Sequence, residues 1–184
     1  MRKHRWRALA GVLATLLVAP SMASAGNFDT FVELPAEGSS SVSAVIGSAI
    51  GVTNQPRTFR FGVDYGYSVN GPLLLDVGAQ VGIAGDIFLL HLAPGIRYLA
   101  PMSDLTFVPY GKVALAVDLL SGGGTPDRDL AVGIKLGAGL HYFFHEAIAI
   151  GPELSLTAGT ASGDSGSDSA LQVDALLTVA WRVP

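Results

Sequence analysis

The sequence predicts an all-β fold, an eight-stranded antiparallel up-and-down transmembrane β-barrel. Of the 184 residues, 49% are hydrophobic and only 14% are charged, which excludes an intrinsically disordered chain. Behind the N-terminal leader, no stretch approaches the roughly 18 consecutive apolar residues of a membrane-spanning helix. Apolar and polar residues instead alternate with a period of two, and turn-forming residues separate the alternating segments. These patterns indicate strands joined by short turns.

The first 25 residues are predicted to be a cleaved secretory signal peptide. Four basic residues precede the apolar stretch Leu9 to Val18, and Ala23-Ser24-Ala25 offers a small-residue cleavage site. The apolar stretch is too short to cross a bilayer of ~30 Å as a helix. We expect residues 26–40 to be an N-terminal tail or a short added strand, and residues 41–184 to form the barrel.

The charge of the chain limits its partners. The formal net charge is −4 at pH 7, and loss of the basic leader makes the mature chain more acidic. A nucleic-acid partner is therefore not expected. The chain has 0 cysteines, which excludes disulfides and thiolate metal sites, and export without cysteine favours a bacterial envelope protein.

The strands are predicted from the alternation and from the turns between them. Asn70-Gly71-Pro72 and Gly85-Asp86 are tight turn sequences, whereas Ser121 to Arg128 and Thr160 to Ser169 are the longest predicted connections. The second of these is of low complexity and is expected to be a mobile loop. In order, the predicted strands are Ser41 to Val52, Arg57 to Val69, Leu73 to Gly85, Ile87 to Ala100, Leu105 to Leu120, Asp129 to Phe144, Ala147 to Gly159 and Ala170 to Val183.

Two features complicate the strand assignment. The first predicted strand is rich in small residues and can also be interpreted as a short helix. Pro94, Pro109 and Pro152 fall within strands, where each removes one backbone donor, so bulges are expected there.

The last strand shows the alternation most clearly. One face carries Leu171, Val173, Ala175, Leu177, Val179, Trp181 and Val183, and the other carries Gln172, Asp174, Thr178 and Arg182. Five strands sort their charged or imidazole groups onto one face in this way. The bulky face carries no charge in any strand, whereas a soluble protein needs a charged exterior. The bulky face is therefore predicted to meet lipid.

The charged face is otherwise built mostly of glycine and alanine, which suits the narrow interior of an eight-stranded barrel. It is predicted to hold an interior charge network of five positive and five negative side chains. Because isolated ions in a narrow lumen are costly, near balance favours a plugged barrel over a pore. The network residues are Arg60, Asp64, Asp76, Arg97, Lys112, Asp118, Lys135, Glu153, Asp174 and Arg182.

Aromatic residues are expected to mark the membrane interfaces. With the N-terminus in the periplasm, seven fall at one rim, and Phe59, Phe61 and Phe88 mark the opposite rim. The seven membrane-interface aromatics are Tyr65, Tyr67, Tyr98, Phe107, Tyr142, Phe144 and Trp181.

No catalytic, cofactor or metal residues are predicted. His91, His141 and His145 are the histidines behind the leader, and with Ser155 and Glu153 a hydrolase-like trio is imaginable. However, no nucleophile elbow or known spacing is present. His141 and His145 lie about 13 Å apart on a strand, too far for one metal ion.

Part of the sequence resembles a known family. Val108-Pro109-Tyr110-Gly111-Lys112, the Gly-rich strand end Gly137 to Phe144, and Ile150 to Leu156 with its Gly and Glu resemble the small outer-membrane β-barrel domain of OmpA/OmpX and opacity-porin type. This resemblance implies location in the bacterial outer membrane, insertion by the barrel-assembly machinery, and structural, adhesive or unknown roles. Such chains commonly end on an aromatic residue, whereas here Arg182-Val183-Pro184 follows Trp181.

Three functional hypotheses follow. The first is a non-enzymatic, monomeric outer-membrane barrel, porin-like in fold, whose partners are outer-membrane lipid and, during insertion, the barrel-assembly machinery. The second is a soluble exported barrel that binds an apolar ligand inside. The third is a lipid-modifying outer-membrane enzyme.

Overall fold

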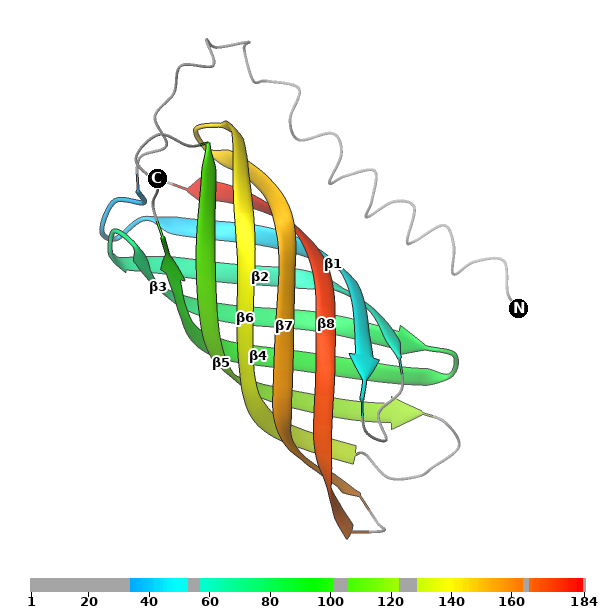
Figure 1. Cartoon of the computed structure of the whole chain (residues 1–184). Coiled ribbons are helices and arrows are strands. Elements are labelled where there is room, and N and C mark those ends of the chain that lie inside the picture. Colours follow the sequence, from blue (N-terminus) through cyan, green and yellow to red (C-terminus); the bar gives the residue numbers. More distant parts are fainter. Residues whose placement is uncertain (1–33, 53–56, 101–105, 123–128, 164–165, 184) are drawn as a thin grey trace.

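The computed structural model describes residues 34–52, 57–100, 106–122, 129–163 and 166–183. The predicted signal peptide, residues 26–33, the predicted turns at 53–56 and 101–104, and residues 105, 123–128, 164–165 and 184 lie outside the described residues. Eight strands form one closed barrel (Figure 1). They are β1 Ser40–Gly51, β2 Thr58–Asn70, β3 Leu73–Ala84, β4 Ile87–Leu99, β5 Phe107–Gly122, β6 Asp129–His145, β7 Ile148–Gly163 and β8 Gly166–Val183.

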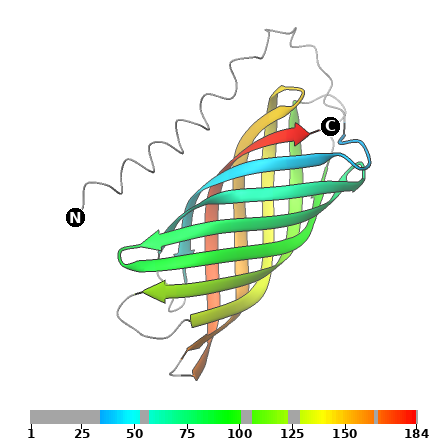
Figure 2. The ribbon, with the colours of Figure 1, turned by 180° about the vertical axis from the view of Figure 1, so that it is seen from behind.

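Every strand pairs antiparallel with its neighbours in sequence, and β1 closes the barrel against β8. Ser40 at the start of β1 faces Val183 at the end of β8, so both ends of the barrel wall lie at one rim, which we call the terminal rim (Figure 2). The opposite rim is the far rim. The predicted fold class is confirmed, including β1, which is a strand paired on both sides and not a helix.

The bulges predicted at three prolines are wrong. The register continues unchanged through Pro94, Pro109 and Pro152. A proline removes one donor but adds no residue, so the partner strand has nothing extra to accommodate. The register shifts lie instead between Ser68 and Asn70 and between Phe143 and His145, beside turns at the terminal rim.

The loop predicted at Thr160 to Ser169 is also wrong. Thr160 pairs with Ser169, and the pairing continues to Gly163 opposite Gly166, so β7 and β8 extend as a hairpin beyond the far rim (Figure 1). Ser121 and Gly122, which were expected in a loop, likewise belong to β5. The low-complexity composition of this segment had suggested a loop. The hydrogen bonds between paired strands come from the backbone and need no particular side chain, so this composition is compatible with a hairpin.

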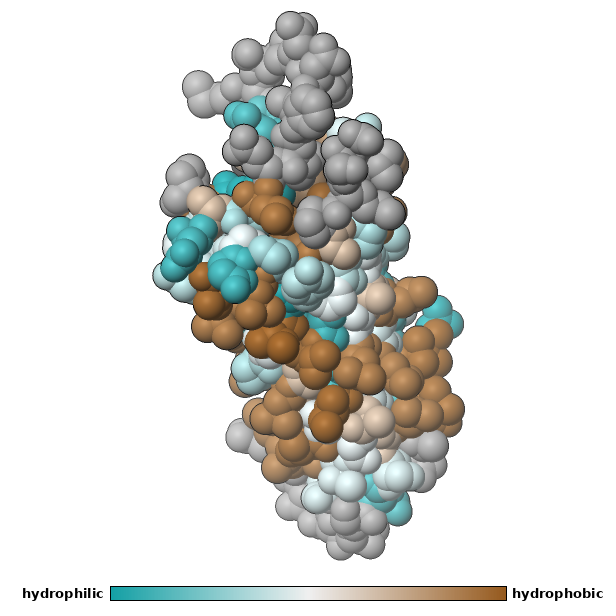
Figure 3. All heavy atoms as spheres, turned by 60° about the vertical axis from the view of Figure 1, so that its left-hand side comes forward, coloured by the Kyte–Doolittle hydropathy of each residue, from teal (hydrophilic) through white to brown (hydrophobic). Residues whose placement is uncertain are grey.

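The exterior of the described barrel is apolar. Figure 3 shows hydrophobic side chains over a broad area in the middle of the wall. Val63, Leu115 and Ile134 are exposed at mid-strand positions, whereas the charged residues predicted on the opposite face are largely buried. This polarity contradicts the hypothesis of a soluble barrel with an apolar interior. Among the described residues, no helix is long and apolar enough to cross a membrane.

Inward-facing glycines allow the wall to close tightly. A Cβ on Gly62 would lie 2.5 Å from the Cα of Gln80 on β3, and one on Gly95 would lie 2.6 Å from the Cα of Ala114 on β5. Both distances are closer than real Cβ atoms come. The small residues of the inner face thus allow strongly bent strands to approach each other.

The interior is less uniformly small than the sequence pattern predicts. Leu74, Leu99, Val108 and Phe143 are buried together near the terminal rim. Leu34 packs against this cluster from the segment that precedes β1. That segment is attached to β2 by backbone hydrogen bonds of 2.9 Å from Gly38 to Ser68 and from Ser68 to Ser39. The described part of the predicted tail therefore covers the apolar cluster.

The ionic lumen as the candidate functional site

Two carboxylates and two cations from four consecutive strands form what we call the first ion cluster. Lys112 Nζ on β5 lies 2.8 Å from Asp64 Oδ2 on β2 and 2.6 Å from Asp76 Oδ2 on β3. Arg97 Nη2 on β4 lies 3.2 Å from the same Asp64 oxygen and 2.8 Å from Asp76 Oδ1. All four side chains are buried, and their formal charges cancel.

Small residues make room for this cluster. Asp76 has Gly66 as its partner on β2 and Gly95 as its partner on β4. Asp76 can therefore extend into the lumen and meet Lys112, whose strand β5 is not a neighbour of β3.

The second ion cluster lies nearer the far rim and consists of Arg60, His91, Asp118, Lys135 and Asp174. Asp174 Oδ2 on β8 lies 2.9 Å from Lys135 Nζ on β6 and 3.6 Å from Arg60 Nη1 on β2. Asp118 Oδ1 on β5 lies 3.7 Å from Arg60 Nη2 and 2.5 Å from His91 Nδ1. Arg60 thus connects carboxylates from opposite sides of the barrel.

Neutral side chains extend the second cluster. Gln172 Nε2 donates to Asp174 Oδ1 at 2.7 Å, and Gln172 Oε1 accepts from Arg60 Nη2 at 3.1 Å. Ser155 Oγ donates to Asp174 Oδ2 at 3.1 Å. Charge-assisted hydrogen bonds of this kind offset the cost of burying the ions.

An aromatic layer of Tyr110, His141 and Phe143 lies between the first ion cluster and the terminal rim. The rings of Tyr110 and His141 are 4.6 Å apart, and those of His141 and Phe143 are 6.1 Å apart. The Arg97 guanidinium lies 5.0 Å from the centre of the Tyr110 ring, and that of Arg182 lies 4.2 Å from the centre of the Phe143 ring. Two cations therefore flank the layer.

The structure buries nine of the ten side chains predicted to form the interior charge network. Eight of these nine belong to the two ion clusters, which also include His91. The ninth, Glu153, accepts a hydrogen bond from Tyr110. Arg182 differs, because it is half-exposed at the terminal rim and contacts Phe143. The sequence-based list omitted His91 and Tyr110. The alternation had nevertheless placed His91 on the charged face, since it shares the inward parity of Arg97 on β4.

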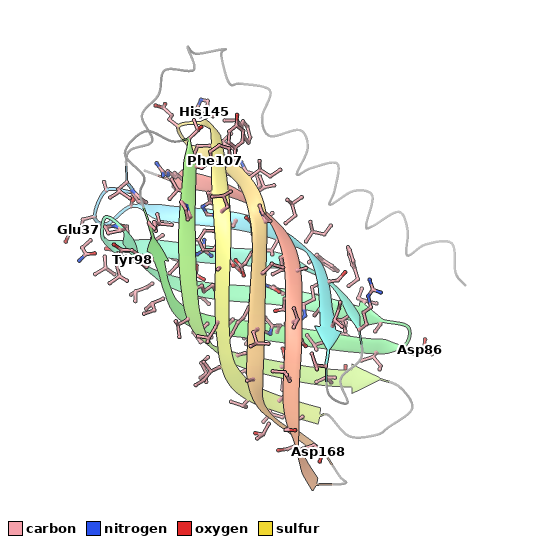
Figure 4. The ribbon with its side chains drawn as sticks, in the orientation of Figure 1. Glu37, Asp86, Tyr98, Phe107, His145 and Asp168 are labelled. Atoms are coloured by element: carbon pink, nitrogen blue, oxygen red, sulfur yellow. The ribbon has the colours of Figure 1, made fainter. Side chains whose placement is uncertain are left out.

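The seven predicted interface aromatics all avoid the lumen. Six are exposed, and Trp181 is half-buried. In Figure 4, Tyr98 and Phe107 lie near the terminal rim, on the side of Glu37 and His145, whereas Asp86 and Asp168 lie at the far rim.

The groups of the imagined hydrolase trio do not come together. Ser155 donates to Asp174, Glu153 accepts a hydrogen bond from Tyr110, and His91 pairs with Asp118. His91 and Ser155 are both buried behind the wall, away from the lipid-facing surface. In the described part of the chain, no group of three or more His, Asp or Glu side chains could hold a metal ion.

Comparisons with solved structures identify known proteins of similar fold. The β-barrel domain of Pseudomonas aeruginosa OprF matches with a TM-score of 0.62 and 17% identity over 80% of this chain and 98% of its own. Neisserial surface protein A matches with a TM-score of 0.62 and 13% identity, over 78% and 95% of the two chains. The outer membrane protein OprG of P. aeruginosa matches with a TM-score of 0.56 and 10% identity, over 84% and 99%.

The chain has the fold of bacterial outer-membrane β-barrels. The prediction of such a barrel is confirmed at the level of the fold, and the apolar exterior is that of a protein embedded in lipid. No protein-family model matches the chain, and no curated protein sequence is significantly similar to it.

Two small cavities lie among the described residues of this outer-membrane-type barrel. The two best-defined cavities have volumes of about 10 and 20 Å³. The first lies beside Asp118 and Gln172, and the second lies at the aromatic layer. A cavity of that size holds about one water molecule, so neither provides a path through the barrel.

Proposed function

We propose that the protein is a monomeric outer-membrane barrel with a plugged, charge-balanced lumen and a structural or surface-interaction role, neither a diffusion pore nor an enzyme. The observation that carries this proposal is that two ion clusters from strands all around the barrel are buried in its interior. A conducting pore needs a continuous hydrated path, and an ion-selective pore commonly lines it with rings of one sign of charge.

The connectivity of the clusters supports a plug. Lys112 on β5 joins carboxylates from β2 and β3, and Arg60 on β2 reaches carboxylates from β5 and β8. To open a path, several buried ion pairs would have to separate at once. Each separated ion would need a new partner or water, so the interlocked pairs support a closed lumen.

The non-catalytic role is supported by the separation of the potential catalytic groups. A nucleophile must lie within hydrogen-bond reach of its base and be accessible to substrate. Ser155 instead donates to Asp174, and both are buried. We place the terminal rim in the periplasm, which keeps the threading from a periplasmic N-terminus used in the sequence analysis, and the β7–β8 hairpin, which extends beyond the far rim, at the cell surface.

Single-channel recording in planar lipid bilayers tests the plug. Purified mature protein is expected to produce no conductance steps, with a large porin as the positive control. The variant D64A/D76A/R97A/K112A removes the first ion cluster without changing net charge and is expected to raise conductance. Its matched control is Leu115→Ala, which truncates an exposed side chain on the outer face.

The result from the unaltered protein decides the proposal. Regular channel openings would overturn it, whatever the variant does. Heat-modifiable migration on a denaturing gel shows whether each variant is folded, so that a leak from damaged barrels is not taken for a channel.

A further inference from the structure

We propose that the cavity at the aromatic layer is a binding site for one weakly hydrated monovalent anion of chloride or bromide size. This cavity, which we call the mouth cavity, has a volume of about 20 Å³. Residues from the segment before β1 and from β1, β3, β4, β6 and β8 line it, so it lies inside the terminal rim of the barrel.

Two residues that line the cavity each have a buried nitrogen atom with no hydrogen-bond partner. Arg97 directs Nη2 to Asp64 and Asp76, but its Nε has no hydrogen-bond partner. His141 Nε2 also has none, although the residue is 95% buried at a relative exposure of 5%. Both residues line the mouth cavity. The Arg97 Nε–H can only donate, and an unsatisfied buried donor is costly, so an occupant that accepts hydrogen bonds is favoured. His141 adds a second donor in the tautomer that carries the ring proton on Nε2.

The lining groups favour an anion over water. A guanidinium can only donate hydrogen bonds, and Arg97 and Arg182 both line the cavity. No carboxylate stands among the described residues that line it. Ser39, Ser40 and Ser41 also line the cavity, and their hydroxyls can donate to an anion as well as accept from water. The two guanidinium groups, which only donate, favour an occupant that accepts hydrogen bonds and carries negative charge.

The walls also select among anions. Leu74, Leu99 and Phe143 form the apolar part of the lining. An ion entering such a site loses hydration, and the loss is larger for fluoride than for chloride or bromide because small ions are hydrated more strongly. The site therefore prefers chloride and bromide to fluoride.

An ion can reach the site from the terminal rim. Ser39 and Arg182 line the cavity and are both half-exposed. Ser39 belongs to the segment that is hydrogen-bonded to Ser68, so this segment forms one side of the cavity.

Bromide is the probe for the crystallographic test. Anomalous diffraction from crystals of the mature protein grown in bromide should show a peak in the mouth cavity, at hydrogen-bond distance from Arg97 Nε. In detergent solution, the melting temperature should rise with chloride or bromide to a plateau, but not with equimolar fluoride, because binding to the folded state alone stabilises it.

His141→Phe and His145→Phe form a matched pair for the solution test. His141→Phe keeps a ring between Tyr110 and Phe143 and removes Nε2, so it should abolish most of the halide-dependent rise. His145 does not line the cavity, and His145→Phe should keep the full rise.

Three outcomes overturn the proposal. The first is the absence of an anomalous peak in the cavity. The second is a peak without any effect of halide on the melting temperature, which means binding at crystal concentration only. The third is an equal effect of halide on the melting temperatures of wild type and His141→Phe. The wild-type measurements decide even if His141→Phe fails to fold, and they are independent of whether the lumen conducts.

Discussion

The hydroxyl of Tyr110 donates a hydrogen bond of 2.8 Å to Glu153 Oε2 across the width of β6. Tyr110 on β5 has Gly139 as its register partner on β6, and a Cβ on Gly139 would collide with the Tyr110 ring. The missing side chain thus allows the ring to lie over β6 and reach β7. This bond connects the aromatic layer to a carboxylate that the two ion clusters do not neutralise.

Loss of the hydroxyl should therefore destabilise the barrel. In Tyr110→Phe, the buried Glu153 carboxylate loses its donor, and we expect the free energy of unfolding to fall by about 1–3 kcal/mol. Urea titration of the protein refolded in detergent measures this. Tyr142→Phe is the matched control, because Tyr142 is exposed on the outer face of the neighbouring strand. Equal effects of the two substitutions would contradict the buried role of the Tyr110 hydroxyl.

The inward glycines give a second prediction. Gly62→Ala places a Cβ 2.5 Å from the Cα of Gln80, so β2 and β3 must separate, and a cost of about 1–3 kcal/mol is expected. Gly111→Ala should be nearly neutral, because a Cβ there meets nothing within 4 Å. Urea titration of the two variants side by side checks this. If Gly111→Ala proved the more harmful, the assigned inner and outer faces would be reversed.

The first ion cluster predicts a non-additive pair of substitutions. Lys112→Met removes the cation nearest both Asp64 and Asp76 and should cost about 3–5 kcal/mol, because buried carboxylate charge is left uncompensated. Adding Asp76→Asn to that variant restores the charge balance and should recover part of the loss. A double-mutant cycle measures the coupling. Strict additivity would mean that the two residues do not interact.

The depth of the barrel in lipid can be tested from its outer face. Ile134 and Val52 are equally exposed, at 58%, but Ile134 lies in the middle of β6 and Val52 just beyond β1 at the far rim. Ile134→Arg should cost about 2–4 kcal/mol in lipid vesicles, and Val52→Arg about 0–1 kcal/mol. Folding titrations in vesicles give both values. Equal costs would show that the middle of the wall is not in hydrocarbon.

The period-two alternation was sufficient to predict the faces of the strands. On β8 it placed Asp174 inside and Leu177 outside, and the structure buries the first and exposes the second. A side chain's parity depends only on the backbone, so one sequence is enough to sort it. The turns at Asn70-Gly71-Pro72 and Gly85-Asp86 fixed the neighbouring strand ends to within about two residues, for the same local reason.

Contacts across the lumen could not be predicted in this way. Parity placed Arg97 and Asp64 on the inner face, but their ion pair joins β4 to β2 and depends on how far the strands are sheared around the barrel. The burial of Phe143 was not predicted, because its bulky neighbours Tyr142 and Phe144 make both faces of this strand end apolar in the sequence. The β7–β8 extension was missed because its pairing leaves no pattern in the side chains.

Because β1 pairs with β8, the same barrel could form from a chain that begins at a different strand. Ser40 and Val183 are register partners, so a short linker could join the end of β8 to the segment before β1 without crossing the lumen. New termini could then be opened at the β7–β8 hairpin, where the paired strands extend past the rest of the wall. Such a circular permutant would present both its ends on the opposite side of the bilayer, which makes this barrel suitable for displaying fused peptides there.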